Sequence, residues 1–129
     1  MKEGTVFEVE YSVSEEVYNG FIKIFKDANP LHTDEVFAKE KKFAGKVMHG
    51  AILAGFLSNF VGEQLPQKNV IVQSYKMNFI RPVYLGDRIK LKAIVDGVFE
   101  SVNCVIFKYG FTNADGIIVC KGEVSIGII

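Results

Sequence analysis

One segment of this 129-residue chain constrains its fold more than any other, because it has helical spacing and is apolar on nearly every side. From residue 49 to about residue 65, large apolar residues recur every three to four positions and small residues lie between them. The large residues are Ile52, Leu53, Phe56, Leu57, Phe60 and Val61, and the small ones are Ala51, Ala54 and Gly55. A helix of this kind must be buried on several sides. The sequence therefore predicts a long central helix that ends at Pro66.

Most of the remaining chain shows the alternation of apolar and polar residues that is typical of half-buried strands. The strand-like segments are residues 5–13, 75–81, 89–95, 101–112 and 117–128, the last two flanking a turn signal at residues 113–116. One strand, a buried helix and then about four strands predict an α+β fold, with an antiparallel sheet packed on one long helix. Because no linker or internal repeat interrupts the pattern, we expect residues 1–129 to form a single domain.

Two shorter helices are expected between the first strand and the central helix. Ser14 can cap the first, whose apolar residues keep helical spacing as far as Phe25. Pro30 then breaks the helix, because the residue before a proline is pushed out of the helical region. Thr33 can cap a second helical piece that runs through Ala38. The chain between these two pieces is therefore bent.

The charge balance and the composition exclude several classes of protein. Fifteen basic and fifteen acidic residues give a formal net charge of zero, without the basic footprint of a nucleic-acid-binding protein. No apolar run reaches the roughly 20 residues that a membrane helix needs. Residues 1–4 contain no apolar signal region, so we expect a cytoplasmic protein.

The two cysteines lie in the expected C-terminal hairpin, and the register of that hairpin decides whether they can pair. If the turn centres on residues 114–115, Cys104 lies opposite about Ser125, and Cys120 lies opposite about Tyr109. Thiols that do not face each other cannot form a cross-strand disulfide. We expect both cysteines to be reduced.

The chain has only two histidines, and the first of them lies five residues after an aspartate. Pro30 prevents a continuous helix between Asp27 and His32, and a bent backbone can turn both side chains toward one point. A carboxylate and an imidazole that face one water molecule form a general acid–base pair. Spacing alone leaves a second interpretation open, in which Asp27 caps a helix and the backbone satisfies His32.

The second histidine begins the central helix. A helix N-terminus presents free N–H groups that can stabilise a developing oxyanion, and Gly50 would let a carbonyl approach closely. Taken alone, however, Gly50 is better explained by tight packing, and the His49 side chain by hydrogen bonding at the helix start. Ser58 is the one hydroxyl of the apolar stretch. We expect it to be buried and bonded to the Ala54 carbonyl, or turned toward Asp27.

Other reaction classes lack their motifs. The sequence has no Cys/His metal spacing, no phosphate-binding glycine loop and no nucleophile elbow. A Ser–His–Asp hydrolase is disfavoured, because Ser58 lies in the middle of a helix and not on a strained turn. We therefore expect neither a metal nor another cofactor.

The segment around Asp27 and His32 resembles the hydratase motif of the MaoC-like dehydratases, which include the (R)-specific enoyl-CoA hydratases. The likeness covers residues 25–34 and a set of residues that follows them. That set is Phe37, Ala38, Phe43, Ala44, Gly45, Val47, His49 and Gly50. Residues 79–87 resemble a strand and turn shared by hotdog-fold proteins generally. The resemblance, which spans about residues 7–126, implies a hotdog fold, with a curved antiparallel sheet wrapped around the long helix.

Residue by residue, the resemblance implies that Asp27 and His32 are the catalytic dyad and that the Gly50 amide is the oxyanion donor. The implied supporting residues are Ser58, Asn29 and His49, of which Ser58 would support the aspartate. Candidate contacts to the acyl chain are Phe25, Leu53 and Leu57, although each is also suited to an ordinary core. One departure is Lys26, which stands where many relatives have a small residue and affects the rim of the pocket.

The resemblance implies reversible hydration of trans-2-enoyl thioesters of CoA or of an acyl carrier protein to (R)-3-hydroxyacyl thioesters. One alternative is a hotdog thioesterase, in which the same water attacks the carbonyl carbon. Another is a non-catalytic acyl-binding subunit, which the presence of both Asp27 and His32 disfavours. Hotdog domains usually pair, so we expect a homodimer or a higher homo-oligomer, with neither nucleic acid nor membrane as partner.

Overall fold

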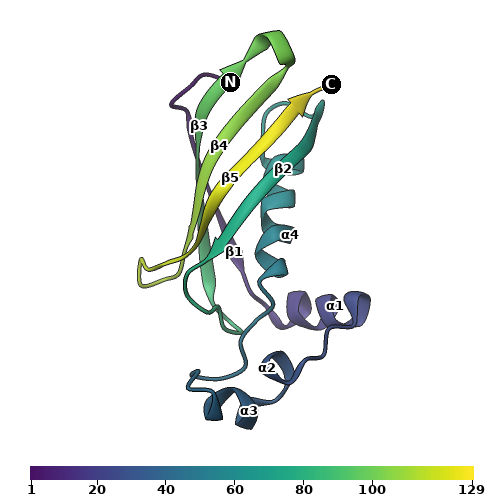
Figure 1. Ribbon diagram of the computed structural model, residues 1–129, viewed down its shortest axis with the longest axis vertical. Helices are drawn as coiled ribbons and strands as arrows, with labels where there is room; N and C mark the ends of the chain where they lie inside the picture. Colours follow the sequence, from purple (N-terminus) through teal and green to yellow (C-terminus); the bar gives the residue numbers. More distant parts are fainter.

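The computed structural model describes all 129 residues and contains one five-stranded antiparallel sheet. The strand order is β1-β3-β4-β5-β2, so the first two strands of the chain form the two edges. Figure 1 shows this sheet curving along one side of helix α4. The strands are β1 (Val6–Ser12), β2 (Val70–Phe79), β3 (Arg88–Phe99), β4 (Cys104–Thr112) and β5 (Ile118–Ile128). The α+β prediction of an antiparallel sheet packed on one helix is confirmed.

The central helix is α4 (Ala51–Asn59), which continues as a π-helical turn, η1 (Phe60–Gln64). Together they account for the segment predicted to be helical. Its apolar residues pack against the sheet, where Phe60 and Phe107 are fully buried with ring centroids 5.7 Å apart. Burial on several sides is what an all-round apolar helix requires. Neither this helix nor any other has the length and apolar character needed to cross a membrane.

Three short helices lie together at one end of the sheet: α1 (Glu15–Phe25), α2 (Pro30–Thr33) and α3 (Glu35–Glu40) (Figure 1). Ser14 caps α1 as predicted. The prediction that Thr33 caps the next helix is wrong, because Thr33 belongs to α2. Asp34 is the cap of α3, and its carboxylate accepts a hydrogen bond from the Phe37 N–H at 3.1 Å. Lys26 ends α1 in the left-handed conformation (φ 60°), where glycine would carry no steric cost.

The C-terminal hairpin has a different register from the one predicted. Cys104 pairs with Gly127 and Cys120 pairs with Phe111, because residues 113–117 form a five-residue turn and the ladder is irregular beside it. Both thiols are free, as expected. Burial raises the pKa of the Cys120 thiol to about 11, so this cysteine is a poor nucleophile at neutral pH.

Strand β2 is an edge strand whose apolar side is incompletely covered. It pairs only with β5. On the side toward α4, Val72, Tyr75 and Phe79 remain 38%, 54% and 57% exposed. An edge strand of this kind has unpaired backbone N–H and C=O groups that can form hydrogen bonds with another strand.

Candidate active site

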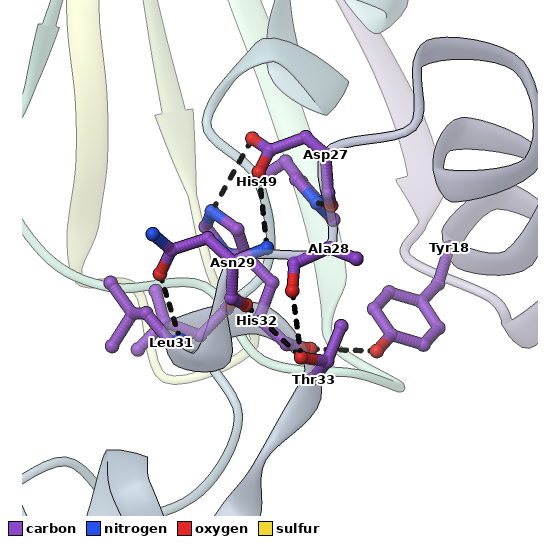
Figure 2. A network of polar contacts seen from close by, with 9 residues as sticks. Tyr18, Asp27, Ala28, Asn29, Leu31, His32, Thr33 and His49 are labelled. Atoms are coloured by element: carbon purple, nitrogen blue, oxygen red, sulfur yellow. Dashed lines mark hydrogen bonds and ion pairs between the residues drawn. The ribbon is translucent and has the colours of Figure 1, made fainter.

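Asp27 and His32 face each other beside the start of α4, as Figure 2 shows. The Oδ2 atom of Asp27 lies 3.7 Å from the Nε2 atom of His32. The Asp27 side chain is 50% exposed and that of His32 is 16% exposed, so the pair can be reached from solvent. Their separation exceeds a direct hydrogen bond, and both atoms are therefore available to a third group.

The turn between the two residues is held by its own polar groups (Figure 2). Pro30 occupies the first turn of α2, and the Asn29 side chain caps this helix by accepting a hydrogen bond from the Leu31 N–H at 3.0 Å. The Asn29 N–H donates to Oδ1 of Asp27 at 3.3 Å. The Thr33 hydroxyl contacts two carbonyl oxygens of the same turn at 3.1 Å. The proline break therefore produces a defined bend that brings the carboxylate and the imidazole together.

A backbone carbonyl sets the orientation of the His32 ring. Its Nδ1 atom lies 2.7 Å from the Val47 oxygen, and since a carbonyl only accepts, Nδ1 carries a proton. In the neutral imidazole, Nε2 then presents a lone pair toward Asp27. The Tyr18 hydroxyl donates to the His32 carbonyl at 2.6 Å and fixes the main chain as well. Neither Val47 nor Tyr18 was expected from the sequence as a contact of His32, because both contacts use backbone oxygens.

The prediction that the His49 side chain serves the helix start is wrong. Its Nε2 atom lies 2.7 Å from the main-chain oxygen of Asp27, in the bent segment. Its ring stacks on that of His32, with centroids 3.9 Å apart and an interplanar angle of 29°. Tertiary packing thus turns the side chain of His49 away from α4 and toward Asp27 and His32.

Gly50 immediately precedes α4, and its N–H donates no hydrogen bond within the protein. A Cβ atom on Gly50 would lie 2.8 Å from the ring of Phe79, which belongs to the edge strand β2. The backbone of Gly50 is helical (φ −58°), so its dihedral angles do not require glycine. The close approach of the Phe79 ring agrees with the packing interpretation, while the oxyanion role of the N–H stays a prediction; Phe79 is a neighbour that the sequence did not indicate.

Two cavities adjoin the facing side chains. One, of about 710 Å³, lies between α1 and α4, and its lining includes Asp27 and Phe25. The other, of about 350 Å³, is lined in part by His32, Gly50 and Leu53. Ala51, the first residue of α4, lines both cavities. Asp27 and His32 thus stand between two apolar spaces, and the predicted contacts Phe25 and Leu53 line different ones.

Ser58 lies apart from Asp27 within one chain. It is exposed, it makes no hydrogen bond, and it lines a third cavity of about 230 Å³ together with Leu57 and Val72. The predictions of a buried serine and of a bond to the Ala54 carbonyl are therefore wrong. Helical periodicity places Ser58 on the side of α4 that the sheet leaves open. Leu57 is 2% exposed and belongs mainly to the core.

Asp27, His32 and His49 bring three possible metal ligands within 4.8 Å of one another. The two imidazoles stack, however, so their lone pairs lie in two offset ring planes, 3.9 Å apart between centroids and 29° from parallel. A metal ion needs ligand lone pairs that converge on one point. The arrangement therefore suits a carboxylate–imidazole pair better than a metal centre.

The chain resembles known proteins along nearly its whole length. The family model described as the MaoC like domain matches residues 1–113. The (R)-specific enoyl-CoA hydratase of Rhodospirillum rubrum is 30% identical over 126 residues, which cover 98% of this chain and 87% of the relative. The enzyme of the same name from Aeromonas caviae is 30% identical over 103 residues, which cover 80% of this chain and 77% of the relative.

The structural comparison agrees. A solved structure described as the (R)-hydratase from A. caviae involved in PHA biosynthesis superimposes with a TM-score of 0.91 at 25% identity. It covers 100% of this chain and 98% of the solved one. The predicted hotdog fold is confirmed by this likeness. Because the family model covers most of the chain and the relatives agree with it, this chain belongs to the MaoC-like domain family.

Proposed function

We propose that the chain is a hydro-lyase that adds water reversibly to trans-2-enoyl thioesters and forms (R)-3-hydroxyacyl thioesters. The observation that carries this proposal is the 3.7 Å separation of Asp27 Oδ2 and His32 Nε2, between two cavities. The relatives named (R)-specific enoyl-CoA hydratases support the reaction and its stereochemistry.

A single water molecule fits the proposed dyad. Nε2 of the neutral His32 ring is an acceptor, since Nδ1 already donates to Val47, and an ionised Asp27 carboxylate is an acceptor as well. A water about 2.8 Å from each atom would donate one proton to each of them. Its oxygen lone pairs would then point away from the dyad, toward the substrate.

In the forward reaction, Asp27 acts as the base. As the water oxygen bonds to the β carbon, one O–H bond breaks and its proton passes to the dyad. The electron pair of the double bond moves toward the thioester oxygen and gives an enolate. The dyad then delivers the proton to the α carbon on the same face. The hydroxyl and the new hydrogen both come from one water, so the side chains return to their starting state.

We propose that the Gly50 N–H stabilises the enolate oxygen. This N–H has no acceptor in the protein and lies at the start of α4, where the partial charge of the helix is positive. Removing a donor of this kind typically costs about 2.7–4 kcal/mol of transition-state stabilisation. Phe25 and Leu53, in the two cavities beside the dyad, are the proposed apolar contacts of a CoA or acyl-carrier-protein thioester. Leu57, the remaining candidate contact, lines the third cavity, which neither Asp27 nor His32 lines.

Product identity tests the proposed reaction. With crotonyl-CoA, we expect the enoyl absorbance to fall while no free thiol appears, and the product to be the (R)-3-hydroxy thioester on chiral analysis. Release of free CoA at the same rate would instead indicate a thioesterase. Tight binding of the thioester without any turnover would indicate an acyl-binding subunit.

We also propose that two copies pair through β2 and α4. The exposed apolar side of β2 continues onto an exposed stripe of small residues on α4, formed by Ala51, Gly55 and Ser58. If two antiparallel α4 helices cross near Gly55, the start of one lies beside Ser58 of the other, because a two-fold interface is self-complementary. Ser58 would then support Asp27 across the interface, which one chain alone does not allow.

Gly55→Glu tests this pairing. A Cβ at Gly55 meets nothing within 4 Å in one chain, so the larger side chain fits a monomer and improves helix propensity. Between two crossed helices it would be buried and charged. We expect the wild type to sediment at twice the chain mass of 14.4 kDa and the variant to sediment as a monomer. Asn19→Glu, on the exposed face of α1, is the control. An unchanged dimer in Gly55→Glu would exclude this interface.

A further inference from the structure

We infer that His49 is a positioning residue that fixes both members of the proposed dyad through one buried imidazole. His49 is 3% exposed, and every other buried residue is apolar, glycine, tyrosine or cysteine. Its ring contacts Asp27 through a hydrogen bond and His32 through a stack (Figure 2). The inference rests on the proposed hydration for its kinetic readout, while its geometric content can be tested separately.

The hydrogen bond fixes the main chain of Asp27. Residues 25–30 are all exposed, and Asp27 follows directly on the end of α1. Its carbonyl oxygen has a single hydrogen-bond partner, the Nε2 of His49 at 2.7 Å. This bond joins an otherwise exposed peptide to a buried ring just ahead of α4. Without it, the carboxylate keeps only the local bond from the Asn29 N–H.

The stack fixes the tilt of the His32 ring. Its in-plane orientation is set by the bond from Nδ1 to Val47, but one hydrogen bond leaves a ring free to rock about that axis. The His49 ring, 3.9 Å away, closes one face of His32. It is itself packed against Phe21, with centroids 4.5 Å apart. A change at His49 should therefore displace both dyad residues at once.

One ring nitrogen of His49 has no hydrogen-bond partner, so the presence of an imidazole at this buried position needs an explanation. A carbonyl only accepts, so Nε2 carries the proton, and Nδ1 is then a buried acceptor with no partner. A buried polar atom without a hydrogen-bond partner destabilises a protein. A phenyl ring would fill the same space without that cost, but it could not hold the Asp27 carbonyl. The hydrogen bond to Asp27 accounts for an imidazole at this position.

Two variants separate the two contacts. His49→Phe keeps an aromatic ring against His32 and Phe21 but removes the donor to Asp27. His49→Gln keeps an N–H that reaches the Asp27 carbonyl but removes the ring. We expect His49→Phe to lower kcat about tenfold to a hundredfold with KM changed less than threefold, because the dyad is misplaced while substrate contacts remain. We expect His49→Gln to recover part of that loss.

A spectroscopic readout makes the test independent of the reaction. The chain has two histidines, so in either variant His32 is the only one and its ring nitrogens are read by ¹⁵N NMR without ambiguity. In the wild type we expect one ring protonated at Nδ1 (His32) and one at Nε2 (His49). His49→Gln lacks the stacked ring, so the His32 ring can tilt and its Nδ1–H bond to the Val47 oxygen should weaken. The preference of His32 for a proton on Nδ1 should then weaken as well.

A folded His49→Phe variant with wild-type kcat would overturn the inference, as would an unchanged His32 spectrum in His49→Gln. If the wild type hydrates no enoyl thioester, the proposed function fails. The His32 spectra would still decide the positioning role in that case.

Discussion

Replacing Asp27 by asparagine is expected to lower kcat for hydration of crotonyl-CoA by about a hundredfold or more, because an amide cannot take a proton from water. The side chain keeps its shape, and its oxygen can still accept the hydrogen bond from the Asn29 N–H. Half of the side chain is exposed, so the free energy of unfolding should change by no more than about 0.5 kcal/mol. The decay of enoyl absorbance gives the rate, and thermal unfolding followed by circular dichroism gives the stability.

Asp115→Asn is the matched control for this substitution. Asp115 is an exposed aspartate at the tip of the C-terminal hairpin, far along the chain from the site. The Asp115→Asn variant should hydrate crotonyl-CoA at the wild-type rate. A rate for Asp27→Asn within threefold of that control would remove Asp27 from the mechanism.

His32→Asn is expected to have an effect of similar size, about a hundredfold or more in kcat. The asparagine N–H can replace Nδ1 as the donor to the Val47 carbonyl, so the fold of the bend is preserved. Nothing then replaces Nε2, the atom that faces Asp27. The same absorbance assay measures the loss, and KM should change much less than kcat.

The double variant provides the sharper comparison. If both side chains hold one water, removing the second after the first should cost little more, since groups that act as a unit are strongly non-additive. We expect Asp27→Asn with His32→Asn to be about as slow as the slower single variant. If the loss of kcat in the double variant equals the product of the two single losses, the two residues act in separate steps.

Local patterns were sufficient to predict the main elements of the fold. The apolar run from residue 49 to about residue 65 predicted α4 and its burial. The turn residues 113–116 predicted the final hairpin, and Pro30 predicted the bend. That bend does bring Asp27 and His32 together, so a carboxylate and an imidazole five residues apart could be proposed as a pair. The resemblance to a family was needed to choose between that pair and a purely structural role.

Contacts between distant segments could not be predicted in the same way. The hairpin register depended on an irregular pairing beside the turn, which leaves no periodic signal. The bond from His49 to the Asp27 carbonyl joins residues 22 positions apart through a backbone atom. Ser58 was misjudged because helical spacing shows which faces are apolar and not which of them the same chain covers.

The close contact between Gly50 and the Phe79 ring limits what conventional mutagenesis can reveal about the helix start. Any residue with a side chain at position 50 must displace that ring, whatever the amide does. Gly50→Ala keeps the backbone N–H, so a slow variant would report the displaced ring and not the loss of the donor. Chemical ligation of a chain with an ester in place of this one amide deletes the hydrogen and leaves every side chain where it was.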